Sequence, residues 1–117
     1  MIVEQTADFE KDLKYYVKKK KYFKLPETIE KLVDDLENGN LPGDKIPGLK
    51  LPENSAAYKV RLENKSANVG KSNGFRIIYY LVVDERIYLL TIYSKKDDER
   101  IVTDSEIAEM IDNILND

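Results

Sequence analysis

Two apolar segments in the second half of the chain constrain its fold more than any other feature. Residues 75–83 and 87–93 are rich in β-branched and aromatic side chains, and only Asp84, Glu85 and Arg86 separate them. Two such segments with a short polar connection predict an antiparallel β-hairpin. Because the hairpin has few polar positions, we expect both of its faces to be covered for much of their length.

The N-terminal third predicts a short strand followed by two helices. Residues 2–5 suit a first strand, and Thr6 is a candidate cap for a helix that extends to about residue 20. Pro26 suits the first turn of a second helix, which Gly39 is expected to end. Two adjacent short helices of this kind form an αα-hairpin.

The remaining patterns complete an α+β fold. Residues 40–55 hold several Pro and Gly residues and predict an ordered loop. Residues 58–62 alternate apolar and charged side chains, as a half-buried strand does, and residues 103–115 combine a capping box with a helical apolar repeat. The expected order is β-α-α-β-β-β-α, with helices packed against a small, mostly antiparallel sheet.

Length and composition restrict the possible chemistry. The 117 residues, 42% of them hydrophobic, fit a single domain spanning residues 1–117. The absence of Cys and His excludes disulfides, thiol nucleophiles, Ser-His-Asp hydrolysis and imidazole metal sites. No apolar run approaches the roughly 20 residues of a membrane helix, and no signal-peptide core is present. We therefore expect a cytoplasmic protein that does not act at a membrane.

The charges are arranged in blocks along the chain. Although the net charge is −3, residues 1–25 hold seven Lys against four acidic residues, and residues 54–100 hold nine Lys or Arg against six. Residues 26–53 and 101–117 are acidic. Partners should therefore be inferred from local surfaces and not from the net charge.

Four basic residues form the main candidate site. Lys59 and Arg61 lie two residues apart in one predicted strand, Arg76 begins the next, and Lys95 follows the last, with Lys96 beside it. Since neighbouring antiparallel strands lie about 4.8 Å apart, these side chains can converge on one surface and bind a polyanion. The alternative is a set of solvated charges on an outer face of the sheet.

A second basic group follows the first predicted helix and consists of Lys18, Lys19, Lys20 and Lys21. These lysines are candidates for contact with RNA phosphates, whereas the alternative is a solvated helix end that interacts favourably with the helix dipole. Strand alternation places Tyr93 on the same side as Lys95, where its ring can stack on a base.

The sequence shows no cofactor or metal motif. Gly70, Lys71 and Ser72 are similar to the end of a phosphate-binding loop, but the glycine needed five residues earlier is replaced by Lys65, and a strand follows instead of a helix. No triad of acidic residues has the placement of metal ligands. We therefore expect any catalysis to continue in the presence of a chelator.

Three segments resemble the RelE/ParE toxin superfamily, and most of all its HigB-type branch. They are Tyr58-Lys59-Val60-Arg61-Leu62, Gly74-Phe75-Arg76-Ile77-Ile78-Tyr79-Tyr80 and Tyr93-Ser94-Lys95. The helical hairpin, the loop ending in Ile46-Pro47-Gly48-Leu49 and the order of elements also match, so the resemblance covers most of the chain and implies a RelE-like fold.

The resemblance implies a toxin of a type II toxin–antitoxin system that cleaves mRNA in the ribosomal A site. Its implied partners are a cognate antitoxin and the ribosome with mRNA. Lys59 and Arg61 match the family's basic strand pair, Arg76 matches its Arg after the Gly-aromatic step, and Lys95 and Lys96 match its last basic pair. The position of the C-terminal catalytic Tyr of some members corresponds to Val102.

The chemistry of such cleavage suits these residues. Attack by the ribose 2′-hydroxyl needs a proton acceptor, stabilisation of negative charge on the phosphate, and a proton for the departing 5′-oxygen. Arg76 suits the phosphate because a guanidinium offers paired planar donors. Lys59 is a candidate base or second stabiliser, and Lys95 is a candidate acid.

Two other functions remain open on the same fold. ParE-like relatives bind and inhibit DNA gyrase without catalysis, and a fold alone does not separate them from nucleases. The third possibility is an interaction domain or a degenerate toxin that no longer acts.

Overall fold

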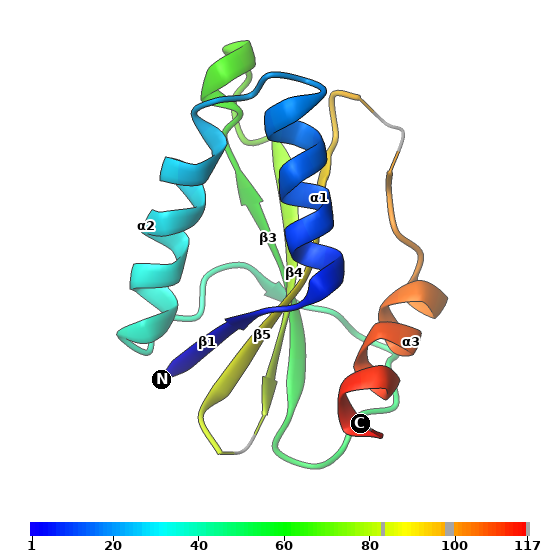
Figure 1. Ribbon diagram of the computed structural model, residues 1–117. Helices are drawn as coiled ribbons and strands as arrows, with labels where there is room; N and C mark the ends of the chain where they lie inside the picture. The colour runs from blue at the N-terminus through cyan, green and yellow to red at the C-terminus, as the bar shows by residue number, and fades with distance from the viewer. Residues whose placement is uncertain (83, 98–99, 117) are drawn as a thin grey trace.

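The computed structural model describes residues 1–82, 84–97 and 100–116, which form one mixed five-stranded sheet with helices on both faces. The strand order is β1-β5-β4-β3-β2, and only the β1–β5 pair is parallel (Figure 1). The elements are β1 (Ile2–Gln5), α1 (Ala7–Lys18), α2 (Leu25–Glu37), β2 (Asp44–Lys45), β3 (Ala56–Leu62), the 3₁₀ helix η1 (Lys65–Ala67), β4 (Phe75–Val82), β5 (Arg86–Ser94) and α3 (Asp104–Leu115).

The α+β class and the order of the predicted elements are confirmed, with one strand added. The addition is β2, a two-residue strand inside the Pro- and Gly-rich loop, which pairs with Tyr58 and Lys59 of β3. A strand this short has no alternating pattern that the sequence can reveal. The predicted end of β4 at Val83 lies outside the described residues.

The first helix is shorter than predicted because the backbone turns sharply after it. α1 ends at Lys18 and not near Lys20, and Lys21 adopts a left-handed conformation with φ of 59°. The N–H of Tyr22 donates to the carbonyl of Tyr16 across this turn. The four consecutive lysines therefore occupy the last helical residue and the turn that follows.

Both faces of the central hairpin are covered, as its composition predicts. On one face, α1 and α2 bury a cluster that includes Phe9, Leu32, Ile77 and Tyr79. On the other face, α3 packs Ile107 and Ile111 against Ile78, Tyr80 and Leu90, and apolar residues of the loop after β2 join them. The sheet therefore lies between the αα-hairpin of α1 and α2 on one face and α3 on the other.

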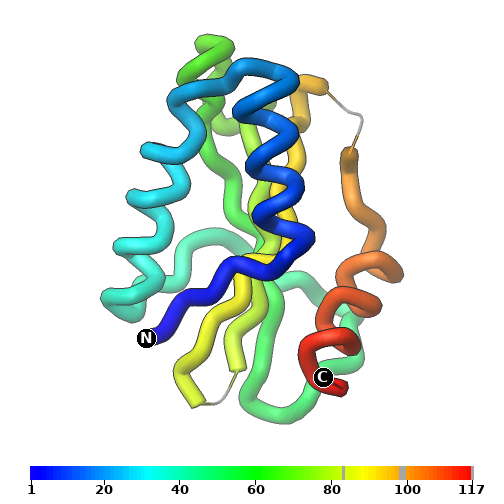
Figure 2. The backbone as a smooth tube through the Cα atoms, viewed as in Figure 1, coloured from blue at the N-terminus to red at the C-terminus, as the bar shows by residue number. Residues whose placement is uncertain are grey.

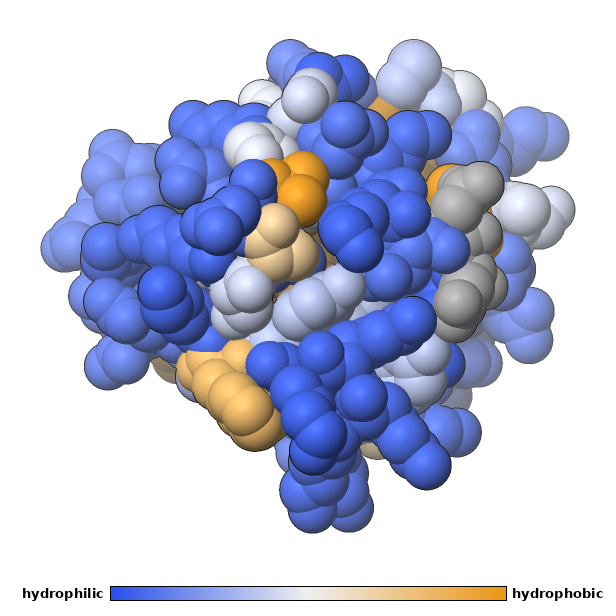
Figure 3. All heavy atoms as spheres, turned by 90° about the horizontal axis from the view of Figure 1, so that it is seen from above, coloured by the Kyte–Doolittle hydropathy of each residue, from blue (hydrophilic) through white to orange (hydrophobic). Residues whose placement is uncertain are grey.

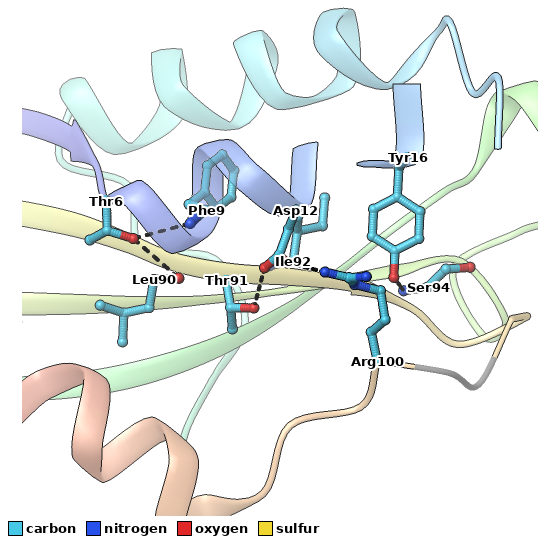
Figure 4. A network of polar contacts seen from close by, with 9 residues as sticks. All are labelled: Thr6, Phe9, Asp12, Tyr16, Leu90, Thr91, Ile92, Ser94 and Arg100. Atoms are coloured by element: carbon cyan, nitrogen blue, oxygen red, sulfur yellow. Dashed lines mark hydrogen bonds and ion pairs between the residues drawn. The ribbon is translucent and has the colours of Figure 1, made fainter. Parts of the chain in front are cut away.

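Side chains of α1 and of its N-cap residue Thr6 complete the edge of β5 where β1 ends. The β1 pairing stops at Leu89, and beyond it the Thr6 hydroxyl donates to the carbonyl of Leu89 at 2.9 Å. Further along, the Asp12 carboxylate accepts the Ile92 N–H at 3.3 Å, and the Tyr16 hydroxyl accepts the Ser94 N–H at 2.9 Å (Figure 4). This helix therefore satisfies backbone groups that a neighbouring strand would otherwise pair.

The same helix also holds the segment that leads to α3. Arg100 forms an ion pair with Asp12 at 3.1 Å, and its guanidinium carbon lies 4.2 Å from the centre of the Tyr15 ring. Asp12 accepts the Thr91 hydroxyl at 2.6 Å as well, so one carboxylate joins β5 to the segment before α3 (Figure 4). Among the described residues, no helix has both the length and the apolar character needed to cross a bilayer.

Candidate functional site

The strand register gathers the predicted basic residues into a compact group. Arg61 of β3 lies opposite Arg76 of β4, and Arg76 lies opposite Tyr93 of β5, so these three residues form one row across the sheet. Lys59, opposite Ile78, lies two residues from Arg61 and so belongs to the next row on the same face. Because Ile78 packs in the cluster beneath α3, all four side chains belong to the α3 face. We call Lys59, Arg61, Arg76 and Tyr93 the strand site.

The Arg76 guanidinium is held by backbone carbonyls of the loop before β4. Nη1 donates to the carbonyl of Lys71 at 3.0 Å and to that of Gly74 at 3.3 Å, while Nη2 donates to that of Ser72 at 2.9 Å. The residue is 7% exposed, and burial together with the neighbouring Arg61 charge lowers its pKa. The carbonyls fix the direction of the guanidinium without neutralising its charge, and among the described residues Nε–H and one Nη2–H have no hydrogen-bond partner.

Tyr93 lies beside the two arginines as a buried phenol. It is 4% exposed, and burial raises its pKa although the Arg76 and Arg61 charges act in the opposite direction. The phenol therefore stays protonated at neutral pH and can donate a hydrogen bond. This protonation state suits a donor to an anion better than a general base.

Lys59 and Arg61 are exposed and line an open pocket of about 380 Å³. Asp44 and Lys45 of β2 and Asp104 from the first turn of α3 complete its polar lining. The sequence patterns did not indicate these three residues, because β2 has no sequence signature and Asp104 lies far along the chain from Lys59 and Arg61. The pocket therefore combines three cations with two carboxylates, and the carboxylates are possible proton acceptors.

A glycine allows β2 to approach β3 at this pocket. Gly43 has φ of +94°, and a Cβ at this position would overlap the backbone of Lys59. Only glycine tolerates both the left-handed conformation and the close approach. The Pro-Gly step before β2 was the sequence signal that could have indicated a tight turn here, but it did not indicate the contact with Lys59.

Lys95 and Lys96 lie beyond the strand site, on the turn that follows β5. Their side chains are exposed, and their backbone N–H groups donate to the carbonyls of Gly74 at 2.8 Å and Asn73 at 3.1 Å. The turn therefore lies against the loop that orients Arg76. Neither lysine lines the pocket that contains Lys59 and Arg61.

The lysines after α1 reach the same turn through Asp97. Lys20 forms an ion pair with Asp97 at 3.5 Å, and the Tyr22 hydroxyl donates to the same carboxylate at 3.1 Å. Burial alone would raise the pKa of Asp97, but the Ser94 and Tyr22 hydroxyls and the Lys20 charge together lower it. Lys18, Lys19 and Lys21 lie on the adjoining helix end and turn, with exposed side chains.

The predicted residues thus form two connected groups and not one pocket. Lys59, Arg61, Arg76 and Tyr93 share a sheet face, whereas Lys95, Lys96 and the four lysines at the end of α1 and in the following turn lie at the adjacent end of the molecule (Figure 1). Val102 is half-buried against the cluster beneath α3. Within the part of the chain that the structure describes, no three acidic side chains gather as a metal site would require.

Comparison of the chain with protein-family models and with curated protein sequences finds no match. The function must therefore be inferred from the chemistry of these two groups and from the fold that positions them.

Proposed function

We propose that this protein is the toxin of a type II toxin–antitoxin pair and acts as a ribosome-dependent endoribonuclease on mRNA in the A site. The strand site carries this proposal, because Arg61, Arg76 and Tyr93 form a row across three strands with Lys59 beside them. The arrangement of an αα-hairpin, a mixed sheet and a C-terminal helix also agrees with the RelE-like fold that the sequence resemblance implies.

Among the described residues, no ion pair compensates the positive charges of the strand site. No described carboxylate forms an ion pair with Lys59, Arg61 or Arg76, although Asp44 and Asp104 line the same pocket as two of them. Like charges directly opposite each other on neighbouring strands are unfavourable. A bound phosphate group, which offers several anionic oxygens to converging donors, would remove this repulsion.

The proposed reaction is attack of the ribose 2′-hydroxyl on the adjacent phosphorus. The 2′-oxygen loses its proton and bonds to phosphorus, the bond to the 5′-oxygen breaks, and that oxygen takes up a proton. Arg61 and the remaining donors of Arg76 would bind the phosphate oxygens, and the Tyr93 phenol would donate to them. The reaction needs no cofactor, and we expect a chelator to leave it unchanged.

Proton transfer in this reaction has four candidate groups. Lys59 is the candidate acceptor or a further stabilising charge, and the Asp44 and Asp104 carboxylates are alternative acceptors because they line its pocket. Lys95 is the candidate donor to the 5′-oxygen. Its exposed position on the turn after β5 allows it to approach a substrate bound across the row.

The same proposal assigns the second lysine group to RNA binding and the antitoxin to inhibition. Lys96 and the lysines at the end of α1 and in the turn after it, Lys18, Lys19, Lys20 and Lys21, would contact phosphates of mRNA or of the ribosome. The cognate antitoxin would present acidic residues to these basic surfaces. The protein would then act in the cytoplasm, where translating ribosomes are found.

Purified ribosomes programmed with a short mRNA provide the test. We expect cleavage in the A-site codon by the wild-type protein, a loss of at least tenfold in Arg61→Ala and Lys59→Ala, and little change in the matched variant Lys11→Ala. Lys11 is exposed on α1, away from the strand site. Cleavage of the same mRNA without ribosomes, or equal cleavage by Arg61→Ala, would contradict the proposal.

A supercoiling assay with purified DNA gyrase separates the alternative. Gyrase inhibition without mRNA cleavage would assign the protein to the ParE-like, non-catalytic branch. If neither activity is found, and induced expression does not slow growth, the fold serves as an interaction domain or degenerate toxin.

A further inference from the structure

Three turns from distant parts of the chain meet at one end of the molecule (Figure 2). The backbone N–H of Lys24 donates to the Ser66 hydroxyl at 2.9 Å, which joins the α1–α2 turn to η1. Asp97 joins the same turn to the segment after β5, through Tyr22 and Lys20. We call residues 18–24, 63–73 and 95–97 the lysine pole.

The lysine pole is strongly basic in a chain whose net charge is negative. Its three segments contain nine Lys and two acidic residues, whereas the whole chain has a net charge of −3. One of the two acids, Asp97, is already paired with Lys20. Seen from this end, the surface is mostly hydrophilic, with a few hydrophobic groups between the polar ones (Figure 3).

Phe23 is exposed in the α1–α2 turn, which is one of the three segments of the lysine pole. It is 67% exposed, the highest value among the large hydrophobic residues of the described chain, although its neighbours Tyr22 and Leu25 are 8% and 2% exposed. In sequence it lies between Lys21 and Lys24. An aromatic ring in this position has no role in the core.

Several contacts anchor the residues on either side of Phe23. The Tyr22 ring stacks parallel to the Tyr16 ring, with centroids 6.3 Å apart, and meets the Phe75 ring edge to face at 5.8 Å. The Tyr22 hydroxyl is bound to Asp97, and the N–H of Lys24 to Ser66. Because the residues on both sides are anchored, little backbone entropy is lost when a ligand binds the exposed ring.

A pocket lies beside the turn and is suited to a phosphate backbone. Lys24 and Lys65 line an open pocket of about 440 Å³, together with Asn68 and Gly70, and one acidic residue, Glu63. A Cβ at Gly70 would meet no atom within 4 Å, so the backbone here is accessible to a ligand. Cations and open backbone next to an exposed aromatic ring match the pattern by which proteins bind single-stranded nucleic acid.

We propose that Phe23 is a stacking platform for an unpaired base of single-stranded RNA and that Lys24 and Lys65 bind the adjacent phosphates. An acidic protein would be attracted by the same lysines, but it would not need an exposed aromatic ring on a turn whose neighbouring residues are anchored. The choice of RNA over DNA rests on the proposed function, because a ribosome-bound nuclease meets unpaired RNA. The binding site itself is separate from the strand site.

Fluorescence anisotropy with a labelled, unstructured 12-nucleotide RNA tests the platform without ribosomes. Since stacking contributes about 1–3 kcal/mol per base, we expect Phe23→Ala to weaken binding about tenfold. Phe23→Trp should retain the affinity, and Phe23→Leu, which keeps hydrophobicity but not the aromatic face, should behave as Phe23→Ala. Leu115→Ala is the matched control, since Leu115 is 45% exposed at the end of α3.

The salt dependence of the affinity separates the contribution of base stacking from the contribution of the lysine charges. Lys24→Ala should reduce the slope of log affinity against log salt by about 0.7, whereas Phe23→Ala should leave the slope unchanged. Lys50→Ala, which removes an exposed lysine from the loop after β2, should change neither slope nor affinity. Thermal melting of each variant checks that the fold is retained.

The outcomes distinguish this proposal from the proposed cleavage. Equal affinity of Phe23→Ala and wild type, an equal loss on the corresponding RNA duplex, or tighter binding of the same DNA strand would overturn the assignment. If Phe23→Ala weakened only the binding of an acidic protein and not that of RNA, the surface would be assigned to that protein partner. Because the assay contains no ribosome, failure here leaves the A-site cleavage result unaffected, and failure of cleavage leaves this result unaffected.

Discussion

Arg61 and Arg76 lie directly opposite each other on β3 and β4, with both side chains on the α3 face of the sheet. Burial, and after it the neighbouring Arg61 charge, lowers the pKa of Arg76, because two like charges at this separation repel each other. Opposing like charges on neighbouring strands reduce stability. The pair therefore lowers the stability of the free protein at the place where we propose that the substrate binds.

Replacing Arg61 with Gln should stabilise the fold and impair cleavage. Removal of the repulsion is expected to raise the free energy of unfolding by about 0.2–1 kcal/mol, measured by urea denaturation. The ribosome assay should show at least a tenfold loss with the same variant. Lys11→Gln, an exposed change on α1, should alter neither quantity by a comparable amount. If Arg61→Gln were less stable than the wild type, the conclusion that the Arg61–Arg76 repulsion destabilises the free protein would be contradicted.

Gly74→Ala should destabilise the loop that orients Arg76, because the added Cβ would overlap the carbonyl oxygen of Leu62. Overpacking of this kind typically costs about 1–3 kcal/mol. Gly70 lies in the same loop, and a Cβ there would meet no atom within 4 Å, so Gly70→Ala is a matched control that should cost little or stabilise slightly. Denaturation midpoints of the two variants measure the difference, and equal midpoints would show that the loop rearranges freely.

Asp12→Ala should destabilise the protein by about 1–3 kcal/mol. The substitution removes the acceptor for the Ile92 N–H and the Thr91 hydroxyl and leaves Arg100 without this partner. Glu10→Ala, an exposed change on the same helix, is the control and should have a much smaller effect. Hydrogen exchange should show faster exchange of the Ile92 amide in Asp12→Ala, and an unchanged rate would mean that another group replaces the carboxylate.

The stability of the protein should fall as the pH rises from about 10 to about 12. Burial raises the pKa of Tyr16 from 10.0 to about 12, so in this range the unfolded chain loses the phenol proton while the folded protein keeps it. Deprotonation then favours the unfolded state, by up to about 1.4 kcal/mol per pH unit. Below pH 10 this contribution does not depend on pH.

Tyr16→Phe tests the origin of this effect. The variant lacks the acceptor for the Ser94 N–H and should be less stable at neutral pH. Its stability should also fall less steeply between pH 10 and pH 12, although Tyr22 and Tyr93, whose pKa values burial also raises, still contribute. Denaturant titrations across this range measure the slopes, and identical slopes would exclude Tyr16 as a source.

Local patterns in the sequence were sufficient for the elements that have a regular repeat or a capping signal. The apolar segments around Ile77 and Leu89 indicated the central hairpin, and Thr103 with Glu106 indicated the start of α3 through a capping box that the structure contains. The two-residue strand β2 and the parallel pairing of β1 were not predictable in the same way. Both depend on contacts between segments far apart in the chain, and neither has a local pattern.

In the candidate site, too, local patterns predicted some features and the tertiary structure decided the others. Strand alternation alone placed Lys59 and Arg61 on one face, because successive side chains of a strand point to opposite faces. The register between strands decided that Arg61 faces Arg76, and the close approach at Gly43 decided that Asp44 joins Lys59. The sequence by itself therefore determined the elements and the side-chain types of this protein, since short-range periodicity and capping control them. Only the tertiary structure decided which charges meet, which are buried and that Phe23 is exposed, since these depend on packing between residues distant in sequence.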